Sequence, residues 1–145
     1  MSSLKPDHPT LRYLLTYAKV IAVVGHSEKP HRDSYQVAQF LRNVGYEIYP
    51  INPRVDEIDG YLSYASLRDV PAPIDIVNVF RRAEFLQQIL DDAIAVQAPT
   101  LWTQLGIADD AIAEQAKAAG LNVIMDTCIK VEHQRLQIEN LETST

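Results

Sequence analysis

The feature that most constrains the fold is an alternation of five short apolar runs, rich in β-branched residues, with segments of helical periodicity. Several runs are apolar at consecutive positions, as expected for strands of a parallel sheet that is covered by helices on both faces. The predicted strands span 20–25, 46–52, 74–80, 100–106 and 121–127. A right-handed series of βα units then predicts an α/β fold: a three-layer, doubly wound, mainly parallel five-stranded sheet of Rossmann-like type.

Helical segments are predicted between these strands and at both ends of the sheet. They span 9–18, 34–44, 83–96, 108–120 and 129–141. The segment 34–44 has apolar residues at i, i+3, i+4 and i+7 from Val37, with Asp33 or Ser34 as its N-cap. Asp7 or His8 is expected at the cap of the first helix. Segment 53–73 contains Gly60 and three prolines, so we expect a crossover there with one short helix.

Length, charge and cysteine content restrict the function. The 145 residues fit one domain, predicted over 1–145 with a core at about 10–137. A net charge of −6 argues against nucleic acid or an anionic membrane as partner, because both require a basic face. Only Cys128 is a cysteine, and no apolar run approaches the length of a membrane span. These features favour a location in the reducing cytoplasm.

The loop after the first predicted strand, GHSEKPHRDS, occupies the place of a dinucleotide-binding fingerprint. The three glycine positions of that fingerprint hold Gly25, Ser27 and Pro30, so the turn glycine is kept and the helix must start later. The N–H groups at a helix start can bind an anion. Hydroxyl and cationic donors could be added by Ser27, Lys29, His31, Arg32 and Ser34. The pattern indicates a modified phosphate loop, with a solvated polar loop as the alternative.

The ends of the second and third strands narrow the class of nucleotide. NAD-binding sites keep an acidic residue about 20 residues after the glycine motif, where it binds the ribose 2′-hydroxyl. Here Asn52 holds that place and Arg54 follows, which favours a nucleotide with an extra ribose phosphate, either NADP or coenzyme A. Phe80 and Arg81 at the third strand end could stack on a ring or bind phosphate, or else pack in the core.

Five motifs, in this order and spacing, resemble those of the single-domain CoA-binding proteins: GHSEKPHRDSY, YPINPR, DIVNVFRR, LWTQLGI and MDTCIKVEHQRL. The resemblance implies a Rossmann-like fold similar to the CoA-binding domain of the succinyl-CoA synthetase alpha subunit. It also implies that the first loop takes the CoA pyrophosphate and that the next two strand ends flank the adenosine. The implied residues are Gly25, Ser27, Arg32 and Ser34 for the pyrophosphate, and Asn52, Pro53, Arg54, Val79, Phe80 and Arg81 for the adenosine.

Three further residues complete the predicted ligand-binding set. His26 belongs to the first loop, although a loop histidine is more often solvated than functional. Trp102 and Gln104 lie in the fourth apolar run, where a lone tryptophan more often packs in the core than against a ligand.

A catalytic interpretation would depend on Cys128, with Lys130 or His133 nearby in sequence to increase its thiolate fraction. The alternative is a small, buried, unreactive residue. Asp126, Cys128 and His133 lack the clustering of a zinc site, so no metal is expected. The CoA ligases that the resemblance points to phosphorylate a histidine in a second domain. His133 belongs to the C-terminal segment and is expected to be a packing or capping residue instead.

The leading hypothesis is a module that binds coenzyme A or an acyl-CoA without complete catalytic machinery of its own, and whether it is an enzyme stays open. The alternatives are an NADP-dependent oxidoreductase that uses Arg54 for the 2′-phosphate, and a protein-interaction scaffold. The expected partner is a small-molecule nucleotide. A homo-oligomer or an unidentified protein partner is left open.

Overall fold

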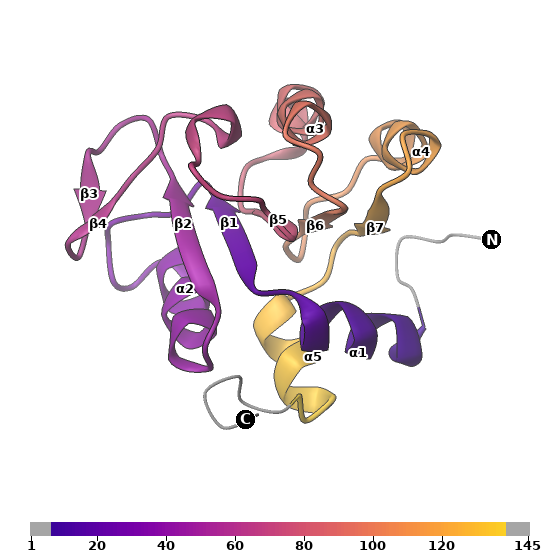
Figure 1. Cartoon of the computed structure of the whole chain (residues 1–145), viewed down its shortest axis with the longest axis horizontal. Helices are drawn as coiled ribbons and strands as arrows, with labels where there is room; N and C mark the ends of the chain where they lie inside the picture. Colours follow the sequence, from indigo (N-terminus) through magenta and orange to yellow (C-terminus); the bar gives the residue numbers. More distant parts are fainter. Residues whose placement is uncertain (1–6, 139–145) are drawn as a thin grey trace.

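The computed structural model describes residues 7–138, which form a five-stranded parallel sheet with helices on both faces (Figure 1). The strands are β1 (Val20–Val24), β2 (Glu47–Ile51), β5 (Ile76–Val79), β6 (Thr100–Thr103) and β7 (Asn122–Ile124). They lie in the order β2-β1-β5-β6-β7, and every pairing is parallel. The predicted doubly wound α/β fold is confirmed. The strands are shorter than predicted because residues at one or both ends of each predicted run belong to loops.

The sheet separates two hydrophobic cores. Helices α3 (Leu86–Ala95) and α4 (Asp110–Ala118) cover one face, and α1 (His8–Tyr17), α2 (Asp33–Asn43) and α5 (Ile129–Arg135) cover the other (Figure 1). Successive residues of β1 alternate between these cores, with Ala22 beneath α3 and α4 and Val23 beneath the other three helices. This is why the strand is apolar at consecutive positions. No helix within residues 7–138 is long and apolar enough to cross a membrane.

The helix ends differ in part from the predicted ones. Asp7 caps α1 as expected, accepting a hydrogen bond from the backbone N–H of Thr10. The N-cap of α2 is Arg32, not Asp33 or Ser34, and it makes no side-chain capping bond. The predicted helix 83–96 begins with a 3₁₀ turn, η2 (Ala83–Phe85).

The C-terminal helix α5 is shorter than predicted. The structure ends it at Arg135, and Gln137 takes a left-handed conformation with φ +54° that stops the helical path. The N–H of Ile138 then turns back to the carbonyl of His133 at 3.2 Å. Positions 139–141 of the predicted helix lie outside the described residues.

The crossover 53–73 contains a β-hairpin that the sequence analysis missed. Strands β3 (Glu57–Ile58) and β4 (Tyr61–Leu62) pair antiparallel around Asp59 and Gly60, whose φ angles are +52° and +86°. Two positive φ angles are typical of a type I′ turn, which Asp-Gly favours. The one short helix expected in this segment is the 3₁₀ helix η1 (Leu67–Asp69), which the side chain of Ser66 caps.

His133 joins α5 to the rest of its core as a packing residue. Its ring lies edge-on to Phe40 and Tyr46, with centroids 5.3 and 5.8 Å away, and is buried. Its Nε2 has no hydrogen-bond partner among the described residues. Burial therefore lowers the pKa of His133 and favours the neutral ring.

This burial predicts loss of stability in mild acid. Because the pKa of His133 is lower in the folded chain than its ordinary value of 6.5, the unfolded chain takes up the proton first as the pH falls. Stability is therefore full above pH 6.5 and declines below it, towards the folded-state pKa. We expect the thermal midpoint to fall between about pH 7.5 and pH 5.5, and H133L to lose part of that fall.

H31Q, which removes a histidine from an exposed position, is the control. His26, whose pKa is also lowered by burial, supplies the remaining dependence in H133L. A midpoint of H133L that depends on pH as steeply as that of the wild type would contradict the assignment.

Candidate ligand-binding site

The site lies at the point where the chain reverses its direction across the sheet. From β1 the chain runs to β2 on one side, and it later returns to β5 on the other side of β1. In open parallel sheets the loops at such a switch point diverge and leave a crevice for a ligand. Gly25 follows β1 at this point, and Phe80 follows β5, its N–H donating to the carbonyl of Val24 at 2.8 Å.

Gly25 is required there for two physical reasons. Its φ of +87° is in the left-handed region that favours glycine. A Cβ at this position would also lie 3.1 Å from Cδ of Arg81 and 3.2 Å from the carbonyl carbon of Phe80. The two loops can approach this closely only because position 25 has no side chain.

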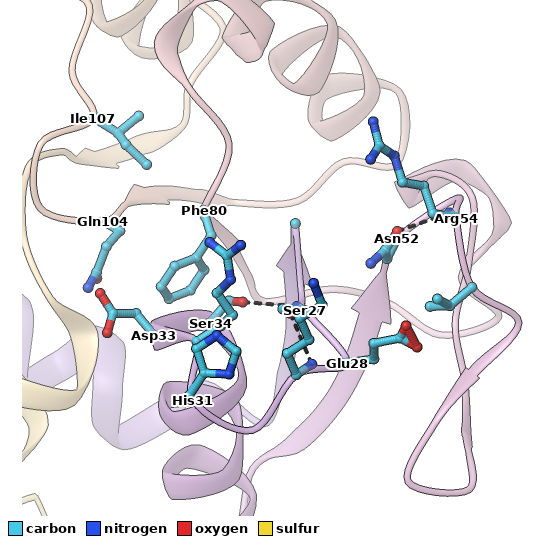
Figure 2. Close-up of a pocket in the computed structure, with 14 residues that line it drawn as sticks. Ser27, Glu28, His31, Asp33, Ser34, Asn52, Arg54, Phe80, Gln104 and Ile107 are labelled. Atoms are coloured by element: carbon cyan, nitrogen blue, oxygen red, sulfur yellow. Dashed lines mark hydrogen bonds between the residues drawn. The ribbon is translucent and has the colours of Figure 1, made fainter.

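A cavity of about 680 Å³ opens beyond this contact, within the size range of small-molecule sites (Figure 2). Its walls come from the β1–α2 loop, the segment after β2, and the ends of β5 and β6. The predicted site residues that line it are Gly25, Ser27, Arg32, Ser34, Asn52, Arg54, Phe80 and Gln104. The other lining residues are Glu28, Lys29, His31, Asp33, Val55 and Ile107.

The β1–α2 loop holds its own shape and leaves donors for a ligand. The N–H of Ser27 donates to Oγ of Ser34 at 2.9 Å, and the N–H of Lys29 donates to Oγ of Ser27 at 3.0 Å (Figure 2). Both hydroxyls act as acceptors in these bonds, so each still has a proton to donate. The first N–H groups of α2 also lack partners within the helix, and no side chain caps them.

Asn52 connects the two loops that form opposite walls. Its Nδ2 donates to the carbonyl of His26, and its Oδ1 accepts from the N–H of Arg54, both at 2.9 Å. An aspartate could not make the first of these bonds, because an ionised carboxylate has no proton to donate. The hydrogen bonds that join the two loops therefore explain why Asn52, an amide, stands at the position where NAD-binding sites keep an acid.

Charge in the cavity is positive on balance although the chain is acidic. Lys29, Arg32 and Arg54 contribute cationic side chains, against the carboxylates of Glu28 and Asp33. The amino end of α2 adds the partial positive charge of the helix dipole. The cavity is therefore suited to an anion at this end of the sheet.

The far end of the cavity offers an acceptor instead. Gln104, with Ile107 and Phe80 as apolar neighbours in the lining, has a buried Oε1 without a hydrogen-bond partner among the described residues. A buried unpaired carbonyl is costly, so a ligand N–H or O–H would be favourable here.

Five predicted site residues lie outside the lining of this cavity. Trp102 is completely buried in the core that α1, α2 and α5 cover, where its Nε1 donates to the carbonyl of Thr127 at 2.9 Å. Val79 is buried within β5, and His26 is buried with Nδ1 bonded to the carbonyl of Ser27. The three side chains are therefore buried and do not line the main cavity.

Pro53 and Arg81 line a smaller cavity of about 140 Å³ on the side of α3. The guanidinium of Arg81 stacks 3.9 Å over the ring of Phe85, which lines the same cavity. The residues predicted to flank one ligand are therefore divided between two neighbouring cavities.

Some residues that line the main cavity were not predicted as site residues. Asp33 could have been found, since an acid in the first turn of a helix after a phosphate loop faces the same space. Val55 and Ile107 carry no chemical signal, and only their positions directly after predicted elements could have pointed to them.

Cys128 lies elsewhere. It is buried at the N-cap of α5 and lines a separate cavity of about 270 Å³ beside Asp126, Thr127 and Val131. Within residues 7–138 no group of three or more His, Cys, Asp or Glu side chains could hold a metal ion.

With this geometry established, comparison with known proteins decides the family. The model of the CoA binding domain matches residues 19–134, from the start of β1 into α5. The chain belongs to the CoA-binding domain family. The matched range contains every residue of the main cavity.

The relatives of this chain differ in how much of their own length the similarity covers. The uncharacterized protein YneT of Bacillus subtilis is 41% identical over 128 residues, which cover 88% of this chain and 95% of YneT. The acetate–CoA ligase (ADP-forming) of Methanocaldococcus jannaschii is 25% identical over 88% of this chain but only 19% of its own length. The crystal structure of Prb, the PH1109 protein redesigned for binding, superposes with a TM-score of 0.91 at 35% identity, covering 97% of this chain and 99% of Prb.

The close approach at Gly25 predicts an unusually costly substitution. An alanine in the left-handed region costs about 1–2 kcal/mol on backbone grounds alone. Gly120 has a similar φ of +92°, yet a Cβ there would meet nothing within 4 Å. We expect G25A to lower the free energy of unfolding by at least about 1 kcal/mol more than G120A, measured by chemical denaturation. Equal losses in the two variants would show that the contact with Phe80 and Arg81 is easily relaxed.

Proposed function

We propose that this chain binds coenzyme A in the 680 Å³ cavity, with the pyrophosphate held by the β1–α2 loop and the amino end of α2. The observation that supports this most strongly is the set of unpaired donors at one place: the first N–H groups of α2, which no side chain caps, and the hydroxyls of Ser27 and Ser34. Backbone amides at a helix start are well suited to phosphate. Membership in the CoA-binding domain family supports the same ligand.

The remaining parts of coenzyme A suit the rest of the lining. Arg54, across the cavity from α2, is suited to the ribose 3′-phosphate, because guanidinium binds phosphate through two parallel hydrogen bonds. The smaller cavity, with Pro53 and the stacked pair of Arg81 and Phe85, offers flat faces for the adenine. The unpaired Oε1 of Gln104 is suited to an amide N–H of the pantetheine arm.

A role in binding without catalysis is the form of this proposal that the cavity favours. Its lining has carboxylates and cations but no cysteine, and Cys128 lines a different cavity. Under this proposal, Asp33 and Glu28 lie near the pyrophosphate. Neither carboxylate would then be placed to act as a general base at the thiol of coenzyme A. An acyl group on the thiol would extend beyond Gln104 and Ile107.

NADP is the second candidate, because Arg54 would suit a 2′-phosphate as well as a 3′-phosphate. Thermal shift measurements with CoA, dephospho-CoA, NADP and NAD separate the two. We expect CoA to raise the midpoint most, and isothermal titration to detect CoA at about 1 mM, where about −4 kcal/mol of binding free energy suffices. Absence of heat with CoA, or a shift with NADP alone, would overturn the proposal.

Arg32 provides the sharpest single-residue test. It lines the cavity at the N-cap of α2, so R32A should weaken CoA about tenfold or more through loss of a charged hydrogen bond. R82A is the matched control, because the exposed Arg82 lies outside the lining of both cavities and pairs with Glu84 at 3.7 Å. Equal affinity in R32A and R82A would argue against the assigned phosphate end.

A further inference from the structure

The β3–β4 hairpin continues directly from one wall of the main cavity. Arg54 and Val55 line that cavity, and the chain enters β3 two residues later (Figure 1). A hairpin with strands of two residues each has little stability of its own. The position of this wall must therefore depend on what holds the hairpin in place.

The base of the hairpin is fixed to β2. The N–H of Asn52 donates to the carbonyl of Tyr64, and the hydroxyl of Ser63 donates to the carbonyl of Asn52, both at 2.9 Å. These bonds fix the two points at which the hairpin segment leaves the sheet and returns to it. They do not reach its tip, seven residues further along the chain from Asn52.

The tip is held by α2. The hydroxyl of Tyr35 donates a hydrogen bond to the carboxylate of Asp59, and the guanidinium of Arg42 lies 3.8 Å from the centre of the Tyr61 ring. Tyr35 and Arg42 are seven residues apart, so they lie on the same face of the helix. The hydrogen bond to Asp59 raises the pKa of Tyr35, which keeps its proton available for this bond. We name these two contacts the hairpin clamp.

The hairpin clamp connects two parts of the proposed site. Tyr35 lies in the first turn of α2, whose amino end would bind the pyrophosphate, and it is not part of the cavity lining. Through Asp59 it reaches the segment that contains Arg54. Helix α2 thus acts together with the bonds of Asn52 to set the distance between the pyrophosphate end and the cation on the opposite wall.

We propose that Tyr35 is a positioning residue that confers preference for a ribose phosphate, by holding Asp59 and thereby Arg54 at a fixed distance from α2. This inference rests on the proposed binding of coenzyme A and concerns specificity within it. It identifies a residue that need not touch the ligand but determines which nucleotide binds best.

The test is the ratio of affinities for CoA and dephospho-CoA, measured by isothermal titration. R54A removes the proposed phosphate contact. Its affinity ratio therefore defines the value expected when the preference for CoA over dephospho-CoA is lost completely. We expect Y35F to weaken CoA about three- to tenfold, as for loss of one hydrogen bond, and to leave dephospho-CoA within about twofold. D59N keeps an acceptor and suits a left-handed turn, so it should retain most of the preference.

Y49F is the matched control. Tyr49 also donates its hydroxyl to an exposed carboxylate, but that carboxylate belongs to Glu47 in β2 and not to the hairpin, and Tyr49 too lies outside the lining of the main cavity. We expect Y49F to keep the wild-type ratio, and ligand-free thermal midpoints to reveal any general loss of stability. A wild-type protein that binds CoA, with an unchanged ratio in Y35F, would overturn this inference alone. Absence of CoA binding by the wild type would overturn the proposed function and this inference with it.

Discussion

The site depends on one close contact, between the backbone after β1 and the backbone after β5. At Gly25 the chain turns with positive φ and passes so near Phe80 and Arg81 that a Cβ would require these neighbours to shift by a few tenths of an ångström. This contact allows the two loops to leave the sheet in opposite directions, one towards α2 and the other towards α3. The large cavity and the smaller one lie on the two sides of this contact, and a ligand that spans them would cross the sheet at the glycine.

Helix α2 has three structural roles, and different parts of the helix perform them. Val37 and Leu41 anchor it in the core, beneath the sheet. Its uncapped amino end, after Arg32, leaves N–H groups for an anion. Tyr35 and Arg42 point away from the core, to the β3–β4 hairpin. Because one rigid element performs all three tasks, the core fixes the distances in the cavity more firmly than loops alone could.

The fold and the loop after β1 that lines the cavity could be predicted because their signals are local. Consecutive apolar residues identify the strands, and a glycine followed by serines ahead of a helical segment identifies the loop. The sequence left open whether Trp102 packs in the core or faces a ligand, since a strand residue can face either layer of the fold. The side of the sheet on which Arg81 lies could not be predicted, because it depends on how the loop after β5 leaves the sheet. The hairpin had a local signal, Asp59-Gly60, which was obscured by the prolines around it. Asn52 lines the cavity, yet its amide joins two loops, a role visible only in three dimensions.

The acidity of the chain is compatible with an anionic ligand because the net surface charge and the charges inside the cavity act on a ligand at different distances. A net charge of −6 spread over the surface is screened beyond about 8 Å at physiological ionic strength, so it has little influence on a ligand already in the cavity. Within the cavity, the amino end of α2, Arg32 and Arg54 supply local positive charge. Glu28 and Asp33 oppose them and reduce the attraction for a bare anion. Under the proposed binding mode, selection would depend on geometry more than on total charge. A ligand whose phosphates match the separation between α2 and Arg54 would gain both contacts while keeping clear of the carboxylates.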